Sequence, residues 1–162
     1  MTIILIGSNE NAFLSTIKSR CMILHFDKIS NEEIEEFLVK NYQIKINSYI
    51  MIDAFQGSIG KALQIKEKQE LYEKIEQIIY SLETKDKIEI LNMSEIIYKA
   101  KDEILDILDY MNVVFINLAK KINKYAYCIE IIEETKRRLK SNANYDMSID
   151  NMLLNLWEQV NL

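Results

Sequence analysis

Residues that interrupt helices are scarce in this sequence. Its 162 residues include no proline and only three glycines, at positions 7, 57 and 60. Because these two residue types are the strongest breakers of regular helix, their scarcity favours a mainly α fold. Hydrophobic residues make up 49% and charged residues 28% of the chain, a balance that allows an apolar core. The length suits one domain or two small ones.

Apolar residues recur at helical spacing from residue 67 to residue 162. Five stripes of this kind predict an antiparallel bundle of about five helices. The stripes are Leu71, Ile75, Ile78, Ile79 and Leu82; Ile88, Leu91, Ile96 and Ile97; Ile104, Leu105, Leu108, Met111, Phe115 and Leu118; Ile129, Ile132, Thr135 and Leu139; and Ile149, Met152, Leu153, Leu156 and Trp157.

Residues 30–66 predict three shorter helices. Ser30 followed by Glu33 forms a capping box, which marks the start of a helix. A second helix is expected over about 47–55, and Gly57 would supply the left-handed residue after it. A third helix is expected to start at Ser58. Together these helices predict a small bundle of their own.

Two short apolar runs in residues 1–29 predict strands. Thr2–Ile6 is β-branched and apolar on both faces, as in a buried and parallel strand. Met22–Phe26 alternates like a second strand, and 11–17 fits a short helix or turn between them. Because a buried strand needs neighbours, we expect further strands before residue 1. The predicted fold is therefore mainly α, with the edge of an α/β sheet before the helices.

The net charge of −5 lies entirely in the second part of the chain. Residues 1–66 hold 7 basic and 7 acidic side chains, whereas 67–162 hold 13 basic and 18 acidic ones. An acidic helical segment binds phosphate backbones poorly by itself. The basic cluster Lys136, Arg137, Arg138 and Lys140 is therefore expected to be a solvated face, with contact to DNA or a partner as the less favoured alternative.

Few residues are suited to metal or nucleophilic chemistry. Cys21 and Cys128 lie far apart without metal-ligand spacing, so we expect reduced thiols, a cytoplasmic protein and no bound metal. His25 is expected to be a packed or surface residue. The run Ile3–Ile6 is too short to span a membrane. The sequence contains no Gly-x-x-x-x-Gly-Lys-Ser/Thr loop, so we expect no binding or hydrolysis of ATP by this chain alone.

The segment Thr16–Cys21, with the sequence TIKSRC, is the strongest candidate for a site. A loop between two strand-like runs would present Arg20 outward, flanked by the small residues Ser19 and Cys21. A guanidinium is always charged and offers forked donors that suit a phosphate. The alternative is a surface arginine that makes an ordinary salt bridge.

Two later motifs extend this observation. Gly57–Leu63 reads GSIGKAL, and Leu139–Asn144 leads into Asp150–Leu154 near the end of the chain. The order of the three motifs resembles the clamp-loader branch of the AAA+ ATPases. In that family the Ser-Arg-Cys motif follows the ATPase core, and the lid carries a sensor motif of the form Gly-Ser-x-Gly-Arg-Ala-Leu. The resemblance covers nearly the whole chain.

The resemblance implies a domain order and roles for particular residues. Residues 1–29 would be the end of the ATPase-like core, 30–66 a three-helix lid and 67–162 a helical collar. Arg20 would act as an arginine finger on ATP–Mg held by a neighbouring subunit. Ser8, Asn9 and Lys61 would be possible nucleotide sensors, while no cofactor would be bound by this chain. The implied partners are the gamma/tau and delta subunits of the loader of DNA polymerase III, the sliding clamp indirectly, and primed DNA through the assembly.

Within this family, Phe13–Cys21 is most similar to subunits of the delta-prime type. The sequence departs from the family pattern at Ser15, where proline is usual, and at Met22, where glutamine is frequent. Lys61 replaces the usual sensor arginine and loses its bidentate fork. One alternative is the same region of a gamma/tau motor subunit. Another is a helical protein–protein adaptor with no role in ATP hydrolysis.

Overall fold

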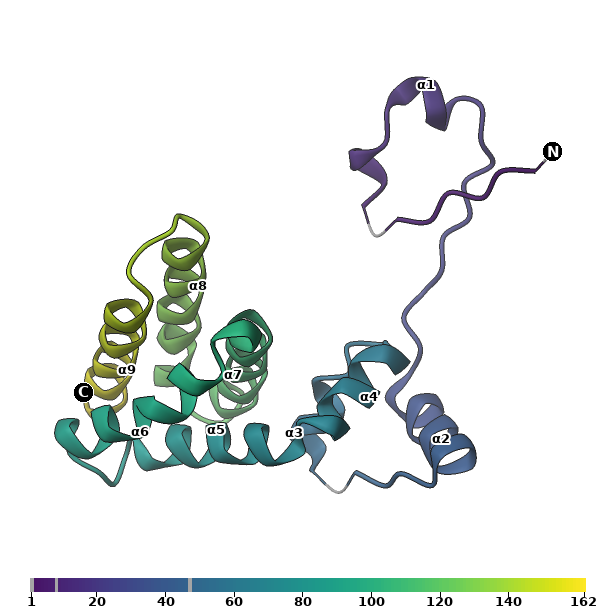
Figure 1. Ribbon diagram of the computed structural model, residues 1–162. Coiled ribbons are helices and arrows are strands. Elements are labelled where there is room, and N and C mark those ends of the chain that lie inside the picture. The colour runs from purple at the N-terminus through teal and green to yellow at the C-terminus, as the bar shows by residue number, and fades with distance from the viewer. Residues whose placement is uncertain (1, 8, 47) are drawn as a thin grey trace.

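The computed structural model describes residues 2–7, 9–46 and 48–162, and within these it is helical (Figure 1). The described residues form nine α-helices and three short 3-10 helices but no strand. The mainly α prediction is therefore confirmed. The α-helices are α1 Ser15–Lys18, α2 Asn31–Tyr42, α3 Tyr49–Asp53, α4 Ile59–Glu67, α5 Gln69–Ser81, α6 Lys87–Lys99, α7 Ile104–Ala119, α8 Ala126–Lys140 and α9 Tyr145–Asn161; the 3-10 helices are η1 Glu10–Ala12, η2 Lys101–Glu103 and η3 Asn123–Tyr125.

The two predicted strands are wrong for the described residues. Thr2–Ile6 and Met22–Phe26 have no strand pairing, and their apolar side chains face solvent, with Ile6 92% and Phe26 91% exposed. A strand requires a hydrogen-bonded neighbour, and neither segment pairs with the other or with another described segment. The expected sheet edge is thus an exposed N-terminal arm. Figure 1 shows this arm, drawn in purple, standing away from the helices.

The three helices predicted over 30–66 are present, and local signals fix their ends. The Ser30 hydroxyl accepts from the Glu33 backbone while the Glu33 carboxylate accepts from the Ser30 N–H, which confirms the capping box. Ser58 caps α4 in a similar way through the Lys61 N–H. Gly57 has a φ of 78°, the left-handed conformation expected of it. The second helix is shorter than predicted, and Asn47 lies outside the described residues.

Helices α5 to α9 form the predicted bundle of five. The most extensive packing joins α8 to α9, α6 to α9 and α7 to α8, and α5 lies against α7. Helix α7 is the most apolar and the most deeply buried. Its buried residues are Ile107, Leu108, Tyr110, Met111, Val113, Val114 and Phe115. Within the described residues, no helix is both long and apolar enough to cross a bilayer.

The stripe predicted for α6 is only partly correct: Ile97 is fully buried and Ile96 packs against the core, but Ile88 does not. Ile88 of α6 is 70% exposed, whereas Ile90, Ser94 and Ile97 are buried. Ser94 can enter the core because its hydroxyl donates to the Leu91 carbonyl at 2.6 Å, so its polar group is satisfied. Because Ser94 is polar, the apolar pattern did not identify it as a core position.

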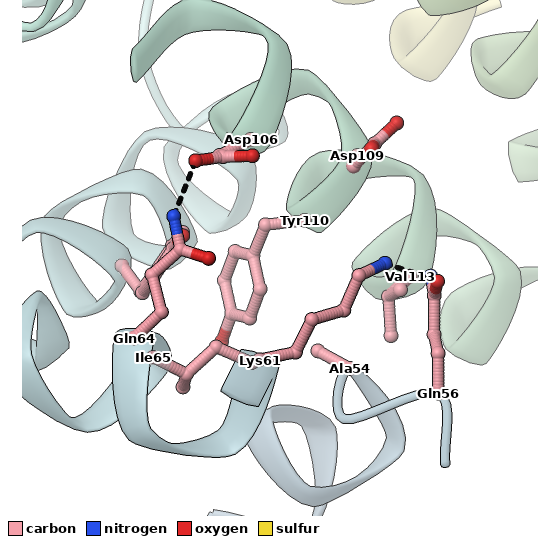
Figure 2. A pocket seen from close by; sticks show the side chains of 10 residues that line it. Ala54, Gln56, Lys61, Gln64, Ile65, Asp106, Asp109, Tyr110 and Val113 are labelled. Atoms are coloured by element: carbon pink, nitrogen blue, oxygen red, sulfur yellow. Dashed lines mark hydrogen bonds between the residues drawn. The ribbon is translucent and has the colours of Figure 1, made fainter. Parts of the chain in front are cut away.

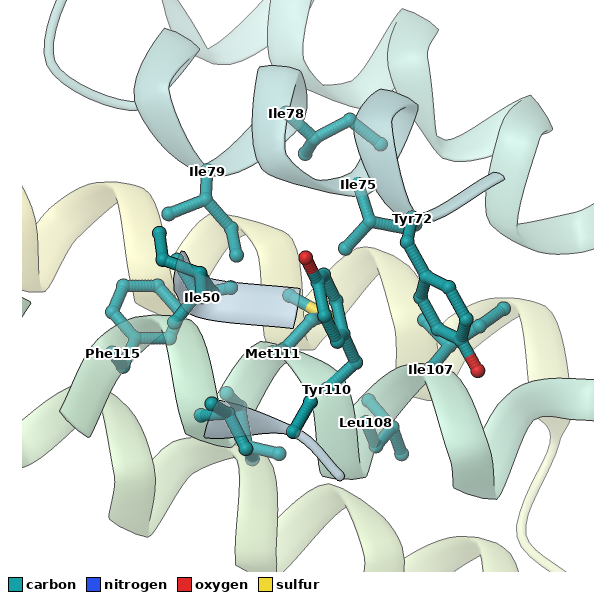
Figure 3. Close-up of a cluster of buried hydrophobic side chains, with 14 of the residues drawn as sticks. Ile50, Tyr72, Ile75, Ile78, Ile79, Ile107, Leu108, Tyr110, Met111 and Phe115 are labelled. Atoms are coloured by element: carbon teal, nitrogen blue, oxygen red, sulfur yellow. The ribbon is translucent and has the colours of Figure 1, made fainter. Parts of the chain in front are cut away.

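A single hydrophobic core joins the three shorter helices to the bundle. Figure 3 shows Ile50 of α3 among the side chains of α5 and α7, close to Ile79 and Phe115. Polar contacts add to this seam: Gln64 of α4 donates to Asp106 of α7 at 2.6 Å, and Lys68 lies 3.2 Å from Glu103. Residues 30–162 are therefore packed as one body.

The basic cluster on α8 is not the continuous solvated face that we expected. The Lys136 side chain is only 10% exposed, and its ammonium lies 2.7 Å from Asp109 and 2.6 Å from Glu133. Burial alone would disfavour its charge, but hydrogen bonds to these two carboxylates outweigh burial and raise the pKa of Lys136. Arg138 is bonded to Glu134 and Asn151. Within the cluster, Lys136 therefore contributes to packing between α7 and α8, whereas Arg137, Arg138 and Lys140 are exposed as expected.

Neutralising both partners of Lys136 should cost far more than the two single changes combined. Asp109→Asn and Glu133→Gln each leave one carboxylate on the ammonium, since each bonds it separately. The double variant leaves a nearly buried charge unpaired, which costs about 3 kcal/mol. Urea unfolding of the four proteins gives the coupling free energy between the two changes.

Glu95→Gln is the matched control. Glu95 pairs with Lys99 at 2.7 Å, but the two side chains are 70% and 75% exposed, so its loss should leave the free energy of unfolding almost unchanged. If the Asp109 and Glu133 effects merely add, the buried ion cluster does not stabilise the α7–α8 contact as described.

Candidate functional site: the exposed Ser-Arg-Cys turn

The Arg20 side chain is held out to solvent by a turn that closes on its own backbone. The Arg20 N–H donates to the Ile17 carbonyl at 3.0 Å, and the Cys21 N–H donates to the Lys18 carbonyl at 3.3 Å. The Ser19 hydroxyl donates to the Thr16 carbonyl at 3.3 Å. These bonds satisfy the polar groups of the turn locally, and Ser19, Arg20 and Cys21 are all exposed.

Glu10, one of the two acidic residues of the arm, interacts with cations other than Arg20. Glu10 lies 3.8 Å from the Lys18 ammonium and 3.9 Å from the His25 imidazole. Among the described residues, no ion pair or side-chain hydrogen bond involves the Arg20 guanidinium. All its donors are therefore free for an external anion, and a forked guanidinium matches the geometry of phosphate oxygens.

The possible sensors on the arm give no support for a nucleotide site. Ser8 lies outside the described residues. The Asn9 side chain accepts from the Asn11 N–H at 2.9 Å and so caps η1. Asn9 belongs to the arm while Lys61 belongs to α4, and Figure 1 shows these two parts well separated. The structure does not bring Asn9 and Lys61 together.

Lys61 lies beside a small cleft between α4 and α7 (Figure 2). Its ammonium donates to the Gln56 side-chain carbonyl at 2.6 Å. Asp106 and Asp109 line the same cleft, so the nearby charges oppose a phosphate. The cleft holds about 40 Å³, which is room for a few water molecules at most. In this structure Lys61 therefore lies at a helix–helix seam, and its role as a nucleotide sensor stays a prediction.

The partners of Lys61 could not be found from the sequence. Gln56 shares a cleft with Lys61 because two residues of the connecting turn, Gln56 and Gly57, have φ values of 52° and 78°. Asp106 and Asp109 come from a helix more than forty positions later, and only the packing of α7 brings them near. No local spacing signals such a contact.

The two cysteines should differ sharply in reactivity. Cys21 is exposed in the candidate turn, whereas Cys128 is buried in α8, and burial raises the pKa of the Cys128 thiol to about 12. Only the thiolate is nucleophilic, so Cys128 is protected both by packing and by protonation. A thiol-reactive dye should modify one thiol in the native protein and two in denaturant. Cys21→Ser should abolish the native reaction, and persistence of that reaction would show that α8 is open to solvent.

Comparisons of the chain with models of known protein families, with curated proteins and with solved structures return no match. No family is thereby shown for this chain. The function is inferred below from the exposed turn, the order of the helical segments and the motifs that they carry.

Proposed function

We propose that the protein is a clamp-loader subunit of the delta-prime type, which supplies Arg20 to an ATP site on a neighbouring subunit. The observation that carries this proposal is the free and exposed guanidinium of Arg20 at the tip of a closed turn. An arginine that stabilised only its own chain would be expected to contact one of its acidic groups. Such a contact is not found among the described residues.

The arrangement of the helical segments supports the same proposal. The turn with Arg20 precedes three short helices that correspond to the proposed lid, and the five longer helices correspond to the proposed collar. Ser58, in the second motif, is the N-cap of α4. The proposed AAA+ segment at 1–29 is extended and exposed here. It would require strands from elsewhere to complete the sheet.

The proposed chemistry needs only the charge and shape of the Arg20 side chain. Negative charge on the γ-phosphoryl group and the leaving oxygen must be stabilised as ATP is hydrolysed. A guanidinium placed there from a second subunit stabilises that charge, while Mg²⁺ and the phosphate loop belong to the ATP-binding subunit. The subunit would thus contribute a catalytic group without being an ATPase. It would work in the cytoplasm, with gamma/tau and delta subunits, during placement of the sliding clamp on primed DNA.

Loss of the guanidinium should slow hydrolysis without loss of assembly. In a loader reconstituted with gamma/tau and delta subunits, Arg20→Ala should lower turnover at the facing site by about a thousandfold. Arg20→Lys should restore little, because an ammonium keeps the charge but loses the fork. ATPase measurements, with size-exclusion chromatography to verify assembly, give both results.

Arg137→Ala is the matched control for lost charge. Arg137 is also an exposed arginine, but it lies on α8 in the proposed collar, so its loss should leave hydrolysis at the site facing Arg20 unchanged. Assembly with unaltered ATPase after Arg20→Ala would contradict the finger and favour a helical adaptor. An intact phosphate loop encoded upstream of residue 1 in the gene would instead favour the gamma/tau alternative.

A further inference from the structure

The N-terminal arm joins the helical body through one close contact. The Ile29 N–H donates to the Gly57 carbonyl at 3.4 Å, just before Ser30 begins α2. Lys28 packs directly on Gly57: a Cβ built on this glycine would lie 2.4 Å from the Lys28 Cβ and 2.9 Å from its Cα. Non-bonded carbon atoms do not approach so closely, so this contact requires a residue without a side chain.

The backbone at Gly57 adds a second requirement. Its φ of 78° lies in the left-handed region, which glycine adopts without the steric cost that a Cβ brings. The turn that contains Gly57 is fixed from both sides, since Phe55 is buried in the core and Ser58 caps α4. Gly57 is therefore a rigid point on the helical body against which the arm rests.

The arm beyond this point is closed on itself. Glu10 lies close to both Lys18 and His25, and the Phe13 ring covers Gly7. Phe26 and Asp27 alone separate this closed loop from Lys28. A shift of Lys28 away from Gly57 would therefore be passed on to this loop, and to Arg20 with it, through only two residues.

We propose that Gly57 is a positioning residue. Because it has no side chain, Lys28 can pack directly on its Cα, and this contact, which we call the seat, sets the direction of the arm that carries Arg20. A side chain at this position would displace the Lys28 backbone. Helix α2 should not move, because its buried Ile34 and Leu38 hold it to the core and its capping box fixes its first turn. The arm would move instead. The contact between Lys28 and Gly57 follows from the geometry alone. Only the effect of Gly57 on ATP hydrolysis rests on the proposed function.

Distances between two spin labels test the seat directly. One label is attached to the native Cys21, and the second to a cysteine introduced by Met147→Cys at an exposed position in the first turn of α9. Cys128 is buried and should not be labelled. Gly57→Ala should shift or broaden the distance distribution between the labels, because the arm leaves its seat.

Gly60→Ala is the matched control. A Cβ on Gly60 would meet only the Ser58 hydroxyl oxygen at 3.7 Å, an ordinary contact, and Gly60 lies in helix α4. This variant should keep the distribution of the parent protein. If Gly57→Ala fails to fold by circular dichroism, Ile29→Pro replaces it, since proline removes the N–H that bonds the Gly57 carbonyl. An unchanged distribution in a folded seat variant would overturn the inference.

The ATPase of the reconstituted loader separates this inference from the proposed function. If both hold, Gly57→Ala lowers turnover as Arg20→Ala does, while Gly60→Ala does not. If Gly57→Ala moves the arm but Arg20→Ala leaves the ATPase unchanged, the seat is correct and the finger is wrong. If Arg20→Ala lowers turnover but Gly57→Ala does not move the arm, the finger is correct and the seat is wrong.

Discussion

Burial of α7 is the constraint on which the rest of the structure depends. Helix α7 packs against α5 and α8 of the bundle and also against α3, so the proposed lid and the proposed collar share one core. Burying a large aliphatic side chain stabilises a fold by about 2 kcal/mol, and α7 buries seven apolar or aromatic residues. A substitution that moved α7 would therefore displace both groups of helices together.

Two tyrosine hydroxyl groups of this core find their partners across helix boundaries. The Tyr110 hydroxyl donates to Glu76 of α5, and the Tyr125 hydroxyl donates to Glu83 at 2.5 Å. Burial, and then the bonded carboxylate, raises the pKa of both tyrosines, so both remain donors. Together with the Lys136 cluster, these pairs explain how an acidic chain can place several charged groups against its core. They fix the register of the helices, and the body that results is a rigid support for the arm.

The sequence predicted those features whose causes are local. Ser30 with Glu33, Ser58 and Gly57 each act within a few residues, and each has the predicted role. The features that it failed to predict depend on distant partners. Met22–Phe26 has the composition of a strand but no neighbour to pair with, and the bond between Lys136 and Asp109 joins residues 27 positions apart. Arg20 could be singled out as a candidate because its motif is local, whereas the cleft around Lys61 depends on the packing of α7.

The central claim is that Arg20 faces the phosphates of ATP on another subunit. A photoreactive group attached to Cys21, the residue after Arg20, tests this most directly in the assembled loader with a non-hydrolysable ATP analogue. Our account predicts a crosslink to the ATP-binding subunit, at residues around its phosphate loop, and loss of that crosslink without nucleotide. A crosslink confined to this chain, or to a surface remote from the nucleotide, would contradict it.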